Sequence, residues 1–281
     1  MNYYDRKTGQ ILQEHGYGDG KLTFLYTTVF GRLLLKLVSA PVASNLAALY
    51  YRSPLSRGKI RRFAAEFLPE LTQQQLSGYR SFNDFFIRTR PTAFDPDPQV
   101  LTAVADSKLS VFPISEALRL DIKNSTYSVE ELLQDRDMAR RFAGGTCLVF
   151  RLVMSDIHHY HFFDRGEVLQ SKKIKGQLHT VRPISEAYRV YARNQRHVTL
   201  MATEHFGTVA QIEVGALLVG RIVNHPIKAF ERGTVKGHFE FGGSTVVVLL
   251  EKNPQLDADI IAANASGLEI RVLAGERIGK R

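Results

Sequence analysis

One stretch near the C-terminal end, residues 236–250, constrains the fold more than any other part of the sequence. It reads KGHFEFGGSTVVVLL, so two glycines precede a serine and a threonine, and an unbroken apolar run follows. Glycine permits tight backbone bends, and a run rich in β-branched apolar residues is typical of a buried strand. The sequence therefore predicts a tight bend that leads directly into a core strand.

The same bend exposes a peptide bond to its own serine. Glycine has no side chain that blocks approach to the Gly243 carbonyl, so the Ser244 hydroxyl can attack that carbon from within the chain. The products would be an ester and, after elimination and loss of ammonia, a pyruvoyl group on a new N-terminus. An ordinary Gly-Ser turn before a core strand is the simpler explanation of these residues taken alone. The reactive interpretation needs a base, an orienting acid and a substrate that suits a ketone.

The charge distribution favours a lipid surface as the partner. The 281 residues have a net charge of +9 and are 44% hydrophobic, which is enough for a large core. Between Lys21 and Ala65 there is no Asp or Glu, and the basic residues there lie among many Leu, Phe and Tyr residues. Positive charge mixed with apolar side chains favours an anionic membrane over nucleic acid, and no signature of a nucleic-acid-binding fold accompanies it. The single Cys147 leaves no internal disulfide and fits a reducing compartment.

The region before residue 91 is predicted to be helical and membrane-associated. Residues 1–20 are polar and are expected to form a loosely held arm without the apolar segment of a secretory signal. Residues 22–51 are strongly apolar, but the charge-free run 37–51 is shorter than the roughly 20 residues that a spanning helix needs. Residues 59–68 place apolar and basic side chains on opposite faces at helical spacing. We expect interfacial helices, and helices that only cover the core are the alternative.

Three prolines at positions 91, 96 and 98 mark the expected boundary between residues 1–90 and residues 91–281. Beyond it, short strand patterns dominate, including a hairpin of residues 197–203 and 208–214. No internal repeat, Walker loop or dinucleotide-binding glycine motif occurs. The expected fold class is α+β, with a β-rich catalytic domain of mostly antiparallel strands preceded by N-terminal amphipathic helices.

The densest group of titratable residues follows an apolar strand pattern at residues 146–154 and reads SDIHHYHFFD. In an extended segment side chains alternate, so His159 and His161 share one face and His158 points to the other. The spacing matches neither the HExxH nor a zinc-finger pattern, so acid–base chemistry is preferred and no metal is predicted. Asp106 falls within a second apolar stretch, where an acid is costly unless it is paired or lies at a turn.

Several motifs now occur in one order along the chain: SFNDFFIR, ADSKL, DIHHYHFF, VGRIVN and KGHFEFGGST. Together they resemble the phosphatidylserine decarboxylase family in its longer form, whose cleavage motif is GGST-like. The likeness covers about residues 81–279. It implies a self-cleaving, pyruvoyl-dependent carboxy-lyase attached to a membrane surface.

The resemblance also implies a role for each matching residue. Ser244 would become the pyruvoyl group, which forms a Schiff base with the substrate, and cleavage after Gly243 would give a β chain of residues 1–243 and an α chain of residues 244–281. Asp106 and His161 match the acid and the second histidine of the family, and with Ser244 they resemble a serine-protease-like triad for self-cleavage.

Two further residues are assigned to turnover of the substrate. His158 matches the first histidine of the family and is expected to act as a proton donor or as a contact to the substrate phosphate. Phe86, in the first motif, is expected to contact the substrate as well. His159 matches no family role, and a packing or surface position is expected for it.

The implied reaction converts phosphatidylserine to phosphatidylethanolamine and carbon dioxide in phospholipid biosynthesis. The pyruvoyl group would be the only cofactor, without metal or pyridoxal phosphate. The implied partners are phosphatidylserine, an anionic membrane surface and a second cleaved protomer, and the implied location is peripheral, on the cytoplasmic face of the cell membrane. The alternatives are decarboxylation of a free, for example aromatic, amino acid, and a non-catalytic peripheral membrane protein on the same fold.

Overall fold

The computed structural model describes residues 2–14, 19–39, 41–122, 125–180, 184, 189–217, 221–241 and 244–281. Gly243, on one side of the predicted cleavage point, lies outside these described residues. Ser244, on the other side, lies within them.

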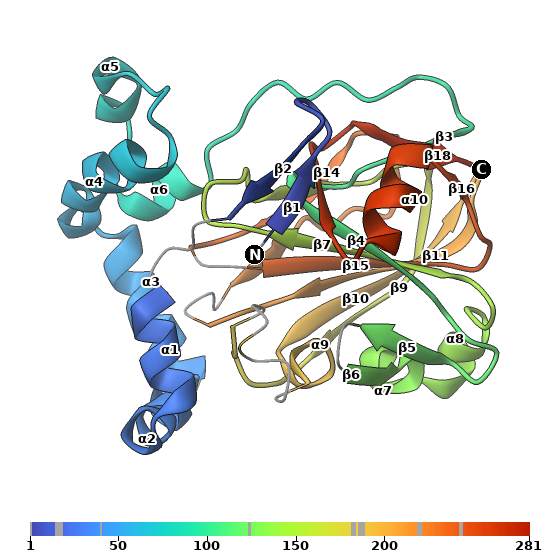
Figure 1. The fold of residues 1–281 in the computed structure, drawn as a ribbon, viewed down its shortest axis with the longest axis horizontal. Helices are drawn as coiled ribbons and strands as arrows, with labels where there is room; N and C mark the ends of the chain where they lie inside the picture. Colours follow the sequence, from blue (N-terminus) through green and yellow to red (C-terminus); the bar gives the residue numbers. More distant parts are fainter. Residues whose placement is uncertain are drawn as a thin grey trace.

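A ten-stranded sheet forms the centre of the molecule (Figure 1). Its order is β13-β9-β10-β11-β15-β7-β4-β17-β1-β2, and every pair is antiparallel except β1 with β17. The predicted α+β fold with mostly antiparallel strands is therefore confirmed. The strands of this sheet are β1 (Asn2–Asp5), β2 (Gln10–Gln13), β4 (Ser107–Pro113), β7 (Thr146–Leu152), β9 (Gly166–Ile174), β10 (Arg196–Thr203), β11 (Gly207–Val214), β13 (Ala229–Phe230), β15 (Ser244–Leu250) and β17 (Glu269–Val272).

The predicted core strand is β15, and it begins at Ser244. It lies between β11 and β7, and all of its residues are buried. Because side chains alternate along a strand, Val246 and Val248 enter one hydrophobic core while Val247 and Leu249 enter the other. The continuous apolar run is thus explained by burial on both faces of the sheet.

Smaller sheets and short helices surround the central sheet. One small sheet, in the order β12-β14-β8, carries part of the histidine-rich segment beside the strand that precedes residue 240. A capping box formed by Ser128 and Glu131 starts α7. These elements are β3 (Val100–Thr102), β5 (Arg119–Ile122), β6 (Ser125–Ser128), β8 (His159–His161), β12 (Ile222–Asn224), β14 (Val235–Phe239), β16 (Gln255–Leu256), β18 (Arg277–Lys280), α7 (Val129–Leu133), α8 (Arg136–Arg140), α9 (Val190–Arg193) and α10 (Ala258–Ala265).

The N-terminal helices project from one side of the β structure, and an extended segment leads from them back over the sheet (Figure 1). The amphipathic helix predicted near residues 59–68 is α4, which buries Ile60 and Phe63 against the phenylalanines of α6. Ser81 caps α6 by accepting a hydrogen bond from the Asp84 N–H at 3.1 Å. The helices are α1 (Asp19–Thr27), α2 (Val29–Val38), α3 (Pro41–Arg52), the 3₁₀ turn η1 (Pro54–Ser56), α4 (Gly58–Phe67), α5 (Gln73–Ser77) and α6 (Phe82–Phe86).

The first residues differ from the expected loose arm. Residues 2–13 form a hairpin, β1 and β2, whose first strand pairs with β17. Arg6 fastens the hairpin by ion pairs to Asp257 and Asp259, at 3.1 and 2.6 Å. The strand pairing and these charges join residues distant in sequence, so the local composition of the arm did not indicate them. Residues 88–97 have no helix or strand, and the domain division at residue 90 stays a prediction.

Within the described ranges, none of the helices has the length and apolar character required to cross a bilayer.

Candidate active site

Three neighbouring strands bring two of the predicted site residues to the same end of the sheet. Across β4, β7 and β15, Lys108 pairs with Arg151, and Arg151 pairs with Thr245. Adjacent strands lie about 4.8 Å apart, so the starts of β4 and β15 are about 10 Å apart. Asp106, just before β4, and Ser244, the first residue of β15, therefore lie at the same end of the sheet.

The Ser244 side chain is fully buried, and its Oγ has no hydrogen-bond partner among the described residues. A buried hydroxyl without a partner costs about 1–3 kcal/mol, so proteins seldom retain one without a use for it. No other contact in the described part of the chain competes for the hydroxyl. The Ser244 hydroxyl is therefore available to act as a nucleophile.

Asp106 lies between β3 and β4, so the apolar stretch is interrupted at the acid, and it is paired as well. Its carboxylate is buried and accepts hydrogen bonds from Arg90 Nη2 at 2.5 Å and from the Ala274 N–H at 2.8 Å. These contacts offset the cost of burying the acid and fix its orientation.

His161 is buried in β8, where its ring lies 5.3 Å from the ring of Phe94. Its Nδ1 is 3.3 Å from the Val104 carbonyl oxygen. Because a carbonyl only accepts hydrogen bonds, Nδ1 carries the proton and Nε2 carries the lone pair of the neutral ring. Burial lowers the pKa of His161, and the Asp106 carboxylate opposes that effect in part. His161 is therefore set up as a neutral base near pH 7.

Asp106 and His161 each have other hydrogen-bond partners among the described residues, and this differs from the triad suggested by the family resemblance. Asp106 bonds Arg90 and a backbone N–H, and the tautomer of His161 is fixed by the Val104 carbonyl. A guanidinium forms stronger, charge-assisted bonds to a carboxylate than a neutral imidazole does, which explains this choice of partner. Asp106 acts on His161 through its charge in this arrangement.

His158 lies in the loop between β7 and β8, and its side chain is fully buried. Its Nδ1 donates to the Asp156 carbonyl at 3.0 Å, and its ring lies 4.0 Å from the ring of Phe86. The structure therefore brings together the two residues expected to contact substrate.

His159 has a structural contact. Its Nε2 donates to the Ile87 carbonyl at 3.0 Å, and its ring lies 5.2 Å from the ring of His238. It thus ties the segment after α6 to β8. Within the described residues, no group of three or more His, Cys, Asp or Glu side chains is arranged to hold a metal ion.

Asp156 is a candidate that the sequence reasoning did not single out. Its carboxylate accepts the Val153 N–H at 2.8 Å, burial raises its pKa, and the nearby Lys108 opposes that rise. It lies two residues before His158, within the motif already noted. This position within the motif is the sequence feature that could have pointed to Asp156.

The segment just before residues 242–243 is held by the N-terminal helices. The Phe241 N–H donates to Asn83 Oδ1 at 3.1 Å, and its ring lies 3.9 Å from the ring of Tyr51. Arg52 of α3 forms an ion pair with Glu240. Sequence reasoning missed these residues because their role arises only from contacts between distant parts of the chain.

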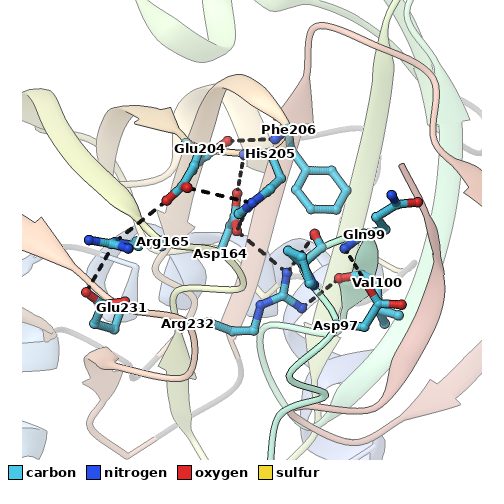
Figure 2. Close-up of polar contacts among 12 residues, drawn as sticks. Asp97, Gln99, Val100, Asp164, Arg165, Glu204, His205, Phe206, Glu231 and Arg232 are labelled. Atoms are coloured by element: carbon cyan, nitrogen blue, oxygen red, sulfur yellow. Dashed lines mark hydrogen bonds and ion pairs between the residues drawn. The ribbon is translucent and has the colours of Figure 1, made fainter.

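A separate polar cluster joins Asp164, His205 and Arg232 to the segment around Val100 (Figure 2). Asp164 accepts hydrogen bonds from His205 Nδ1 at 2.8 Å and from the His205 N–H at 2.9 Å. Arg232 donates to the Val100 carbonyl at 2.7 Å. Asp164, His205 and Arg232 line a cavity of about 280 Å³ together with Phe94. Phe94 thus lies between this cavity and the His161 ring, which is 5.3 Å from its own ring.

Comparison with known proteins shows the family of the chain. Residues 82–280 match the family model described as phosphatidylserine decarboxylase. The chain is 43% identical to phosphatidylserine decarboxylase proenzyme 2 of Clostridium acetobutylicum, over 100% of this chain and 98% of the relative. It is 40% identical to a phosphatidylserine decarboxylase proenzyme of Ruminiclostridium cellulolyticum, over 99% and 97%, and 36% identical to one of Desulfitobacterium hafniense, over 100% and 98%.

The fold, the buried serine and these matches define an enzyme of the carboxy-lyase class. The chain belongs to the phosphatidylserine decarboxylase family.

Proposed function

We propose that this protein cleaves itself before Ser244 and then decarboxylates phosphatidylserine to phosphatidylethanolamine at a membrane surface. The observation that carries the proposal is the buried Ser244 hydroxyl without a partner among the described residues, in a chain that resembles decarboxylase proenzymes over its full length. A proenzyme must be processed, and Ser244 is a nucleophile at the position where the family resemblance places the cut.

In the proposed cleavage, the Ser244 Oγ attacks the carbonyl carbon of Gly243 and its proton passes to Nε2 of His161. The amide C–N bond breaks, the leaving nitrogen takes the proton, and an ester links the two residues. Loss of the Ser244 Cα proton expels the Gly243 carboxylate. The resulting enamine becomes an imine, which water hydrolyses with release of ammonia to leave the pyruvoyl group.

Once formed, the pyruvoyl group would accept the electron pair of the bond between the substrate Cα and its carboxylate as that bond breaks. We assign to His158 the proton that the substrate carbon then takes up. This assignment is supported by its position, since the ring is held between the Asp156 carbonyl and Phe86. Phe86 is fully buried in the aromatic cluster of the N-terminal helices, and we assign to it the exclusion of water on that side.

The surface of α2 supports membrane attachment. One face of this helix is apolar and 58–74% exposed, which is the reverse of the pattern in a helix that faces water. Leu35 on the other side is buried, and Arg32 and Lys36 flank the exposed face. Such a face suits insertion beside anionic lipid headgroups. Its residues are Val29, Phe30, Leu33 and Leu37.

We expect Phe30→Ser, Leu33→Ser and Leu37→Ser together to weaken binding to vesicles of phosphatidylserine and phosphatidylcholine. Burying each such side chain contributes about 1.5–3 kcal/mol, so the loss should be on the order of a hundredfold or more in a sedimentation assay. Ile261→Ser is the matched control, because Ile261 is an exposed apolar residue of α10 on the β structure. Unchanged partitioning of the triple variant would assign α2 a purely structural role.

The substrate is tested by measuring carbon dioxide from carboxyl-labelled phosphatidylserine in vesicles and from free amino acids. We expect carbon dioxide to be released from the lipid alone, because an enzyme for a soluble amino acid would not need an exposed apolar helix. Release from free tyrosine or phenylalanine, but not from the lipid, would favour the amino-acid decarboxylase. Release from neither, with an uncut chain of 31.7 kDa, would favour a non-catalytic membrane protein.

A further inference from the structure

Arg88 has an unused hydrogen-bond donor beside the site. Its Nη2 donates to the Ser155 carbonyl at 2.6 Å, and its guanidinium lies 5.0 Å from the centre of the Phe85 ring. Its Nη1 is buried and has no partner among the described residues. A buried cationic donor without a partner is costly, and such donors are normally satisfied by a group that the protein binds.

The position of Arg88 points to the substrate. Residues 86–88 lie along the histidine-rich loop, since the Phe86 ring packs against His158, the Ile87 carbonyl accepts a hydrogen bond from His159, and Arg88 donates one to Ser155. The same segment follows α6, the last N-terminal helix before the β structure. Arg88 therefore stands where a lipid held by the helices would present its headgroup to the site. A second buried polar atom without a described partner, Nδ1 of His159, belongs to the ring that bonds Ile87.

We propose that Arg88 binds the phosphodiester of the lipid headgroup through Nη1, which fixes the distance between the lipid and residue 244. This inference rests on the proposed function and deepens it. A guanidinium suits phosphate because its planar donors match two phosphate oxygens, and the bond is charge-assisted. Burial lowers the pKa of Arg88, and an anion placed against Nη1 would oppose that effect.

The headgroup has a second anion, the carboxylate, and the reaction argues against it as the partner of Arg88. The carboxylate loses its charge as carbon dioxide departs, so an ion pair to it would stabilise the ground state more than the transition state. The phosphodiester keeps its charge throughout the reaction. A contact to phosphate therefore binds substrate, transition state and product alike, and it slows none of the chemical steps.

The test uses the mature protein and a matched pair of soluble probes, sn-glycero-3-phosphoethanolamine and ethanolamine. Both carry the same amine, and only the first carries a phosphodiester. We expect calorimetry to show that the phosphodiester probe binds at least tenfold more tightly. Arg88→Gln should remove that difference, and Arg88→Lys should restore part of it. Arg80→Gln is the control, since Arg80 is an exposed arginine of the same region and should change nothing.

A kinetic measurement separates binding from a structural role. Because the phosphate contact is uniform along the reaction, Arg88→Gln should raise KM by ten- to a hundredfold and leave kcat within about threefold. Self-cleavage, followed by intact mass, should proceed normally because it needs no lipid. Equal binding of the two probes to the wild-type protein would overturn the proposal, and so would a phosphodiester preference that survives in Arg88→Gln. Both binding measurements are independent of turnover, so they test the proposal even if phosphatidylserine proves not to be the substrate.

Discussion

Ser244→Ala is expected to abolish both self-cleavage and decarboxylation. The substituted protein should run as one chain of 31.7 kDa, whereas the wild-type protein should separate under denaturing conditions into residues 1–243 and 244–281. The reason is chemical, since alanine has no hydroxyl to attack the preceding carbonyl and no oxygen to become the ketone. Intact mass spectrometry measures the cleavage, and labelled carbon dioxide measures the reaction.

Unfolding does not explain this expected loss. The Ser244 Oγ is buried without a partner among the described residues. Its replacement by alanine removes this unsatisfied polar group, so the melting temperature of the precursor should not fall. Ser266→Ala is the control within the same chain segment, because Ser266 is exposed and its Oγ donates to the Ala262 carbonyl of its own helix. Retained carbon dioxide release in Ser244→Ala would eliminate the pyruvoyl mechanism.

The sheet explains why cleavage need not release the smaller chain. Within residues 244–281, β15 pairs with β11 and β7, and β17 pairs with β4 and β1. β18 pairs with β3, and Arg6 of the N-terminal hairpin binds Asp257 and Asp259. Separation would break this strand pairing and expose both cores. The two chains should therefore remain one species under native conditions.

Local signals explain which parts of the fold were predictable. The β15 strand follows from an apolar run, the hairpin of β10 and β11 from two strand patterns across a short turn, and α4 from the helical spacing of residues 59–68. Each of these signals lies within a few residues. The N-terminal hairpin has no comparable signal, because it is stabilised by pairing with β17 more than two hundred and fifty residues away.

In the site, too, the residues themselves could be predicted and their distant partners could not. Motif order indicated Asp106, His158, His161 and Ser244, since the residue types themselves carry the chemistry. Their partners were not predictable: Asp106 bonds residues 16 and 168 positions away, and no local pattern links such positions. The Asn83 contact to Phe241 spans 158 positions for the same reason.

His161→Ala is expected to leave an uncut precursor, because the Ser244 hydroxyl then lacks the base that takes its proton. A positioned base contributes on the order of 10²–10⁴ in rate, so cleavage should fall by that factor. His158→Ala should cleave normally and then release carbon dioxide slowly, since His158 is assigned to the substrate. His225→Ala is the control, because His225 is exposed.

The pH dependence of cleavage distinguishes His161 from the carboxylates nearby. Only the neutral imidazole accepts a proton, so the rate falls as pH drops through the pKa of His161. Burial lowers that pKa below the ordinary value of about 6.5, and the half-maximal rate should therefore lie below pH 6.5. A midpoint above that value, or equal cleavage of the His161 and His158 variants, would shift the role of base to another group. Asp156 would then be the next candidate, because its carboxylate is buried two residues before His158 and burial raises its pKa.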